Sequence, residues 1–184
     1  FIALVPHAEI RLQGLDRNSL QGDSEILKPL LDFGVITHWE NGELKVKHQA
    51  SVALPKLFKY DFTQMPDQAQ TFAFLCAALG IDAELSGLKT LKGKETDRIA
   101  AIENELKKLG LNVVSDENSL KINGKITTKN ASISTYNDHR MAMSGALIGT
   151  RIPVKIENPG VVAKSYPDFW KHLAMLTSEP AIEF

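Results

Sequence analysis

The feature that most constrains the fold of this chain is an internal repeat. Residues 65–71 match residues 136–142, which lie 71 positions later. The match continues without a gap, so that residues 81–85 fall on 152–156. In both copies an aspartate leads an apolar, helix-like run that a short strand-like run follows. Similarity at a fixed period is typical of a chain built from copies of one supersecondary unit.

A second match supplies the rest of the unit. The matching segments are 10–15 with 83–88, 24–34 with 96–110, and 41–46 with 117–122. The unit therefore reads helix, strand, loop, helix, strand, turn and strand over about 71–76 residues. This alternation of helices and strands predicts a mixed α/β (α+β) fold.

The copies at the two ends are incomplete. The first begins midway, with only residues 1–5 where a helix is expected, and the last stops after a helix predicted near 168–176. A unit cut at its start, in a chain that begins with Phe rather than Met, predicts a fragment of a longer protein. The alternative is a degenerate terminal copy of the kind that caps repeat proteins.

Length and composition exclude several classes of protein. The chain has 184 residues, of which 43% are hydrophobic and 23% charged, and this fits a globular domain rather than a disordered segment. A net charge of −1 argues against a generic nucleic-acid binder. The one cysteine excludes an internal disulfide framework. No apolar run approaches the ~20 residues of a membrane span, and residues 1–5 do not read as a signal peptide.

Helix signals agree with the repeat. Residues 97–109 carry apolar side chains at helical spacing, with Thr96 as the expected N-cap and Gly110 as the expected stop. Residues 67–79 and 138–148 are apolar almost all round, which predicts two buried helices led by aspartate.

Strand and breaker signals complete the prediction. Residues 113–114 and 120–122 flank a turn and predict a hairpin. Pro29 removes a backbone donor from the helix-like run 24–33, so we expect a kink or a late helix start there. Residues 50–62 should form a loop and a strand.

Polar residues gather where the predicted helices begin. Three clusters occupy residues 64–67, 92–98 and 136–140, and Lys164 stands in a loop before a further helix. Helix N-termini present unpaired N–H groups and a positive dipole end, which favour anions. Arginine adds a planar fork that fits carboxylate or phosphate. The sequence therefore predicts a site for a small, multiply charged ligand such as a phosphorylated acid.

Each cluster also has a purely structural explanation. Asp67 and Asp138 can be helix N-caps with no role in ligand binding, and on spacing alone this is the favoured interpretation. Residues 94–98 can be a solvated first turn of a helix. His139 can be a structural histidine and Lys164 an ordinary surface lysine.

The same clusters resemble the signatures of one enzyme family. Residues 94–99 with 105–110 and residues 136–143 (Tyr-Asn-Asp-His-Arg-Met-Ala-Met) are similar to the carboxy-terminal signatures of 5-enolpyruvylshikimate-3-phosphate synthases. Shorter segments that fall in the family's order are 18–23, 65–67 and 163–168. The resemblance covers essentially the whole chain but only the carboxy-terminal half of the family's enzyme, which agrees with the truncated first copy.

The resemblance implies a fold and a reaction. The family has two similar domains, each of three β-α-β-α-β-β units with buried helices and outer mixed sheets. Residues 1–184 would form a single domain, the carboxy-terminal half of the enzyme, with its first unit truncated. The implied enzyme is a carboxyvinyl transferase of the shikimate pathway of aromatic amino acid biosynthesis. It transfers the enolpyruvyl group of phosphoenolpyruvate to the 5-hydroxyl of shikimate 3-phosphate and releases phosphate, with no metal or organic cofactor.

The resemblance also implies roles for residues that would contact shikimate 3-phosphate. Asp67 would contact the shikimate hydroxyls and take the 5-hydroxyl proton, and Lys94 would lie near the ring and the reacting centre. Glu95 would protonate the methylene carbon of phosphoenolpyruvate and later remove a proton. At Thr90 the family often has an asparagine that contacts shikimate 3-phosphate; threonine keeps a hydroxyl but loses the reach of the amide.

Basic residues carry the other implied roles. Arg98, Arg140 and Lys164 would hold the phosphate and carboxylate of phosphoenolpyruvate, and His139 would line the site. The implied partners are the two substrates and the missing amino-terminal domain, in the cytoplasm, without nucleic acid or membrane. Because the family's amino-terminal phosphate-binding residues have no counterpart here, we expect the isolated chain to fold but not to turn over.

Other functions share parts of this pattern. A UDP-N-acetylglucosamine enolpyruvyl transferase-like domain would share the fold and the phosphoenolpyruvate, and RNA 3′-phosphate cyclases have related units. A non-catalytic anion-binding module is a further alternative. The runs at 94–98 and 137–143 together favour the shikimate enzyme.

Overall fold

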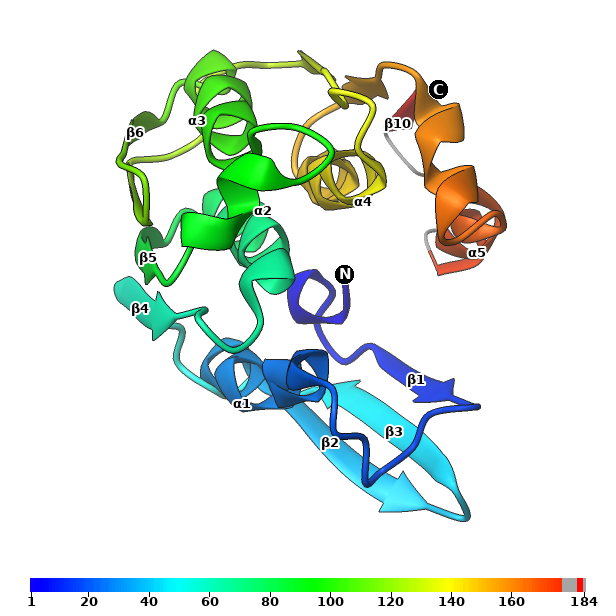
Figure 1. Ribbon diagram of the computed structural model, residues 1–184. Coiled ribbons are helices and arrows are strands. Elements are labelled where there is room, and N and C mark those ends of the chain that lie inside the picture. The colour runs from blue at the N-terminus through cyan, green and yellow to red at the C-terminus, as the bar shows by residue number, and fades with distance from the viewer. Residues whose placement is uncertain (177–181, 184) are drawn as a thin grey trace. The chain divides into compact units, whose positions relative to one another are not determined.

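The computed structural model describes residues 1–176 and 182–183 (Figure 1). The chain divides into two compact units, Phe1–Lys56 and Leu57–Phe184. The elements of each unit follow the order that the repeat predicts.

The first unit is an antiparallel sheet with helical turns before and between its strands. The strands are β1 (Glu9–Leu12), β2 (Val35–Glu40) and β3 (Glu43–His48), in the order β1-β3-β2. The helical turns are 3₁₀ turns at Ile2–Leu4, Gly22–Ile26 and Leu31–Phe33, and α1 (Leu27–Leu30).

Pro29 explains why no long helix forms in this unit. The helix-like run splits into α1, which contains Pro29, and a 3₁₀ turn on either side of it. Proline has no N–H, so it removes a helical hydrogen bond at this point. Gly34 then ends the run at φ +71°, a conformation that glycine adopts without strain. The predicted interruption is confirmed.

The second unit begins with a complete copy of the repeat. Its elements are β4 (Leu57–Asp61), a 3₁₀ turn (Pro66–Gln68), α2 (Ala69–Leu79), β5 (Asp82–Ser86), a 3₁₀ turn (Lys89–Gly93), α3 (Arg98–Lys108), β6 (Asn112–Ser115) and β7 (Ser119–Asn123). The strands form one mixed sheet in the order β4-β5-β7-β6. Strands β4 and β5 are parallel, which requires a crossover, and α2 provides it.

A partial copy of the same unit follows. It contains β8 (Ala131–Ile133), α4 (His139–Gly145), a 3₁₀ turn (Ala146–Thr150), β9 (Val154–Ile156), a 3₁₀ turn (Pro159–Lys164), α5 (Phe169–Leu176) and β10 (Ile182–Glu183). The strands are parallel, in the order β10-β9-β8. A Cβ on Gly145 would lie 2.7 Å from Ile133 Cγ2, so glycine allows α4 to approach β8 this closely.

Helices α2 and α3 both pack in the core of the second unit, but they differ in how much of their surface is apolar. Helix α2 buries most of its side chains, as predicted for a helix that is apolar almost all round, and Phe72 stacks on Phe58 of β4 at 5.4 Å between ring centroids. Helix α3 is amphipathic: Ile102 and Leu106 are buried, whereas Lys107 is exposed. Because both helices are packed along their length, their N-terminal ends are held in fixed positions.

Most predicted elements are confirmed, and two helix starts differ. The N-cap of α3 is Asp97 rather than Thr96, because the Asp97 side chain accepts a hydrogen bond from the N–H of Ala100 at 3.1 Å. The segment at Asp67 forms a 3₁₀ turn, and α2 begins only at Ala69. In the described part of the chain, no helix combines the length and apolar character needed to cross a membrane.

Candidate functional site

The buried guanidinium of Arg98 joins the three predicted clusters. Arg98 is the first residue of α3, and its side chain is 1% exposed. Its Nη1 donates to Asp67 Oδ1 at 2.8 Å, its Nη2 to Glu95 Oε2 at 2.7 Å, and its Nε to Asp138 Oδ2 at 2.6 Å. We call these four residues the Arg98 cluster. Since the planar fork holds three carboxylates from three segments, it fixes the segments relative to one another.

The aspartates that precede α2 and α4 differ in their roles. Asp138 is fully buried and is the N-cap of α4, where its Oδ1 accepts from the N–H of Arg140 at 2.8 Å. Asp67 lies within a 3₁₀ turn, and its side chain caps neither that turn nor α2. The N-cap interpretation is therefore confirmed for Asp138 and wrong for Asp67.

Asp67 lies between two further cations. Lys94 Nζ is 3.3 Å from Asp67 Oδ1, and Arg140 Nη2 is 3.5 Å from Asp67 Oδ2. Arg140 also donates from Nη1 to the backbone carbonyl of Asp67 at 3.2 Å. The side chains of Asp67, Lys94 and Arg140 are 24%, 34% and 28% exposed, so a small ligand can reach all three.

Glu95 and His139 form a second accessible part of the site. Glu95 Oε1 lies 4.0 Å from His139 Nδ1, and the Glu95 side chain is 35% exposed. His139 Nδ1 is buried and has no hydrogen-bond partner among the described residues. Burial lowers the pKa of His139 below its ordinary value, because it disfavours the imidazolium form. A neutral imidazole thus lies beside a carboxylate that solvent can reach.

Lys164 and Thr90 are placed differently. Lys164 is exposed, and its Nζ donates to the backbone carbonyl of Asn137 at 3.0 Å, directly before Asp138. Lys164 is therefore attached to the segment that carries the third cluster. Thr90 is exposed in the 3₁₀ turn Lys89–Gly93, and within residues 1–176 no hydrogen bond links it to the Arg98 cluster. The structure brings the other predicted site residues together, and the 3₁₀ turn that carries Thr90 packs against the 3₁₀ turn Pro66–Gln68 that carries Asp67.

A hollow of about 340 Å³ opens beside His139 and Arg140. Its lining residues are Gln68, Thr71, His139, Arg140, Met143, Ser144, Ser165 and Tyr166. The hydroxyl oxygens of Thr71 and Ser144 are 3.5 Å apart within it. The hollow therefore offers hydroxyl and amide groups next to the cationic end of Arg140.

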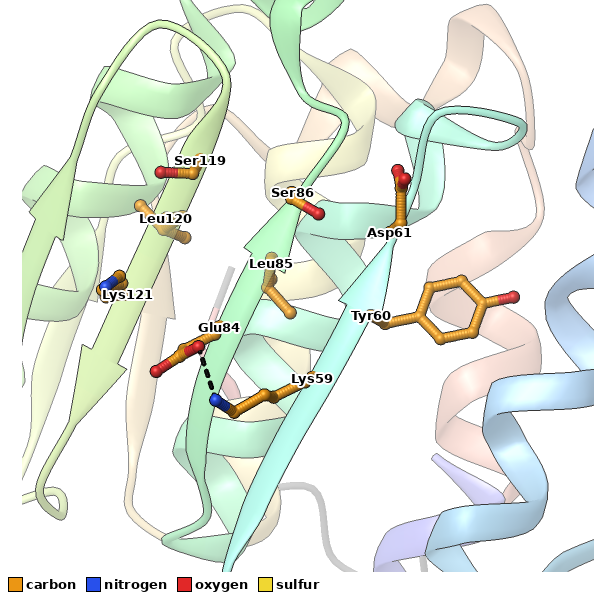
Figure 2. Close-up of a pocket in the computed structure, with 9 residues that line it drawn as sticks. All are labelled: Lys59, Tyr60, Asp61, Glu84, Leu85, Ser86, Ser119, Leu120 and Lys121. Atoms are coloured by element: carbon orange, nitrogen blue, oxygen red, sulfur yellow. Dashed lines mark ion pairs between the residues drawn. The ribbon is translucent and has the colours of Figure 1, made fainter.

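A second hollow of similar volume lies on the β4-β5-β7-β6 sheet (Figure 2). Its Lys59 and Glu84 form an exposed ion pair at 2.9 Å, and none of the predicted site residues line it. The candidate site is thus the Arg98 cluster with its neighbouring hollow. Among residues 1–176 and 182–183, no three or more His, Cys, Asp or Glu side chains gather in a way that could hold a metal ion.

Sequence reasoning missed two buried carboxylates near the site. Asp138 lies in the third polar cluster but was given no role other than that of a possible helix cap, although it also pairs with Arg98. Glu105, whose side chain is fully buried, was not singled out at all. The available signal was its spacing: Glu105 follows Arg98 by seven residues, so both lie on the same face of α3.

Comparison with known protein sequences identifies relatives of this chain. The family model described as EPSP synthase (3-phosphoshikimate 1-carboxyvinyltransferase) matches residues 1–173. A 3-phosphoshikimate 1-carboxyvinyltransferase of Bacteroides fragilis is 40% identical over 176 residues, covering 93% of this chain and 42% of the relative. One from Neisseria meningitidis is 35% identical, covering 95% and 40%. The chain thus spans less than half the length of these curated relatives.

Solved structures show the same fold. The EPSP synthase of Acinetobacter baumannii matches 95% of this chain and 42% of its own length, with a TM-score of 0.68 and 24% identity. The enolpyruvyl transferase NikO of Streptomyces tendae matches 95% and 41%, with a TM-score of 0.67 and 18% identity. The predicted class, an enolpyruvyl transferase-like fold of repeated units, is confirmed.

Proposed function

The chain belongs to the EPSP synthase (3-phosphoshikimate 1-carboxyvinyltransferase) family, and we propose that it forms the half of such an enzyme that carries the acid–base groups. In this proposal residues 1–184 are one carboxy-terminal domain that works with an amino-terminal domain. The complete enzyme transfers the enolpyruvyl group of phosphoenolpyruvate to the 5-hydroxyl of shikimate 3-phosphate. The observation that carries the proposal is the Arg98 cluster, which holds Asp67 and Glu95 in one site with Lys94 and Arg140.

The two accessible carboxylates divide the proton transfers. In the addition step, the 5-hydroxyl oxygen bonds to C2 of phosphoenolpyruvate, Asp67 takes the hydroxyl proton, and Glu95 gives a proton to C3. In the elimination step, the C2–O bond to phosphate breaks, phosphate leaves, and Glu95 removes a proton from C3. Two carboxylates in different surroundings can share acid and base work in this way. Asp67 contacts three cations, whereas Glu95 pairs with one, Arg98, and lies beside the neutral His139.

The cations bind and stabilise the anionic groups. Arg140 and Lys164 have accessible cationic ends, so in the proposal they meet the phosphate and carboxylate of phosphoenolpyruvate first. Arg98 is buried among three carboxylates, and it reaches the ligand only when one of them moves aside. Positive charge fixed near the departing phosphate stabilises the transition state. Lys94 and Thr90 complete the proposed contacts with shikimate 3-phosphate.

The proposed partners are phosphoenolpyruvate, shikimate 3-phosphate and an amino-terminal domain, and the proposed location is the cytoplasm. The pairing of Asp67 with Glu95 through Arg98 supports an enzyme over a non-catalytic anion-binding module. A binding module needs cations, but it has no use for two accessible carboxylates at the anion site.

The test is an amide chemical-shift titration of the chain with phosphoenolpyruvate, with and without shikimate 3-phosphate. We expect shifts clustered at Glu95, Arg98, Arg140 and Lys164. Arg140→Ala should weaken the response, and the control Lys59→Ala, on the sheet hollow of Figure 2, should not. No clustered shift at millimolar ligand would contradict a preformed half-site. Measurable turnover by the isolated chain would contradict the need for the amino-terminal domain.

A further inference from the structure

A second attachment joins α3 to the segment that precedes α4. The Glu105 side chain is fully buried, and its Oε1 accepts from the Tyr136 hydroxyl at 2.7 Å. Its Oε2 accepts from the backbone N–H of Ser134 at 3.2 Å. Lys108 Nζ donates to both oxygens, at 2.8 and 2.9 Å. A carboxylate is costly to bury unless such partners satisfy it, so this burial depends on the segment being in place.

The two attachments lie on one face of α3. Arg98 and Glu105 are seven residues apart, which is close to two helical turns. Arg98 binds Asp138, and Glu105 binds residues 134 and 136. Segment 134–138 therefore runs along α3 with one attachment near each end.

The backbone of this segment is held in an uncommon conformation. Tyr136 and Asn137 have φ values of +53° and +56°, in the left-handed region. This conformation is uncommon for tyrosine, although asparagine adopts it more readily, and for a bulky side chain it persists only where surrounding contacts require it. The backbone carbonyl of Asn137 accepts from Lys164, and its side-chain oxygen accepts from Asn158 at 3.0 Å. The chain then passes directly into residues 138–140.

We propose that Glu105 is a positioning residue: by holding Tyr136 against α3, it sets the direction in which residues 138–140 enter the candidate site. Its effect on ligand affinity rests on the function proposed above. Its effect on the placement of His139 and Arg140 is a property of the fold alone. If Glu105 served stability only, its substitution would lower the free energy of unfolding without moving these two side chains in the folded protein.

Two substitutions test the attachment, and a third serves as the control. Glu105→Gln keeps the size of the side chain, but its amide group would face Lys108 and the N–H of Ser134, which are both donors. Tyr136→Phe removes one hydroxyl. The control is Glu103→Gln, the same change on the same helix, where the glutamate pairs with Lys107 and with Ser115 of β6.

The measurement is the NMR signature of the folded variants. It comprises the His139 ring signals, the Nε–H signals of Arg98 and Arg140, and the dissociation constant for phosphoenolpyruvate. We expect Glu105→Gln and Tyr136→Phe to shift the side-chain signals of His139 and Arg140 and to raise the dissociation constant by about threefold or more. Glu103→Gln should change neither.

The outcomes separate this inference from the proposed function. If the unsubstituted chain does not bind phosphoenolpyruvate, the proposed half-site fails, while the ring and guanidinium signals still decide the role of Glu105. If Glu105→Gln does not fold, Tyr136→Phe decides instead, because it removes only a hydroxyl group. Folded variants whose His139 and Arg140 signals match those of the unsubstituted chain would overturn the inference.

Discussion

Asp67 and Asp138 occupy the same position in successive copies of the repeat, 71 residues apart, yet the structure uses them differently. Asp138 is fully buried, caps α4 and pairs with Arg98. Asp67 is 24% exposed, caps no helix and contacts three cations. The preceding residue separates them locally, since Pro66 starts a 3₁₀ turn at Asp67 whereas Asn137, at positive φ, leaves Asp138 in the extended cap conformation. One repeat position has thus supplied one structural and one accessible carboxylate.

The largest expected effect is on stability, from substitution of the buried aspartate. Asp138→Asn keeps a cap acceptor but leaves Arg98 buried with one charge partner fewer, so we expect a loss of about 3–5 kcal/mol in the free energy of unfolding. Urea denaturation measures it. A loss below about 1 kcal/mol would show that the burial of Arg98 does not depend on its pairing with Asp138. The structural role of Asp138, and with it the contrast with Asp67, would then be contradicted.

Asp67→Asn should act on binding more than on stability. Its side chain is partly exposed and Arg98 retains Glu95 and Asp138, so we expect a loss of only about 1 kcal/mol in the free energy of unfolding. The change leaves Lys94 and Arg140 without their carboxylate, and inorganic phosphate should therefore bind several-fold more tightly. Calorimetric titration with phosphate measures the affinity. If Asp138→Asn tightened phosphate binding by the same factor, this would contradict distinct roles for Asp67 and Asp138.

The residues that follow the two aspartates should differ in how they make stability depend on pH. His139 follows Asp138, and Gln68 follows Asp67. The pKa of His139 is lowered from about 6.5, chiefly by burial, so the unfolded chain binds more protons and stability should fall as pH drops below 6.5. His139→Gln, which gives α4 the residue of the other copy, should remove that part of the pH dependence. Urea midpoints across pH measure it, and an unchanged slope would contradict the burial of His139.

The smallest effect is expected at the exposed ion pair on the sheet (Figure 2). The side chains of Lys59 and Glu84 are 61% and 40% exposed, so Lys59→Ala should change the free energy of unfolding by about 0.5 kcal/mol or less. Any effect should diminish further at high salt. Thermal unfolding at two ionic strengths measures both the effect and its dependence on salt. A loss as large as that of Asp138→Asn would show that burial does not set the scale of these effects.

Elements were easier to predict than the contacts between them. The apolar run that predicted α2 and the helical spacing of apolar residues that predicted α3 are local properties, and so is the effect of Pro29 on α1. The N-cap of α3 was misplaced by one residue because Thr96 and Asp97 are both good caps, and only the geometry of the turn selects the aspartate.

The arrangement of the site depends on distant contacts. Arg98 was predicted as a ligand-binding residue because an arginine near a helix start suits an anion. Of its three carboxylate partners, Glu95 is three residues away, but Asp67 and Asp138 are 31 and 40 residues away along the chain. No local pattern in the sequence predicts those two distant contacts. Glu105 was missed because a glutamate in a helix usually faces solvent. Its spacing from Arg98 puts both residues on one face of α3, but the burial itself follows from the packing of residues 134–136.

Helix α3 also sets a limit on how this chain can change in length. Arg98 and Glu105 reach the same segment only while seven residues separate them along an unbroken helix. One inserted or deleted residue between them would rotate one attachment by about 100° relative to the other, and both could not be kept. A length change after β7, in the loop 124–130, leaves that spacing intact. Natural or engineered length variants that keep the site should therefore vary in such loops and keep the interior of α3 constant.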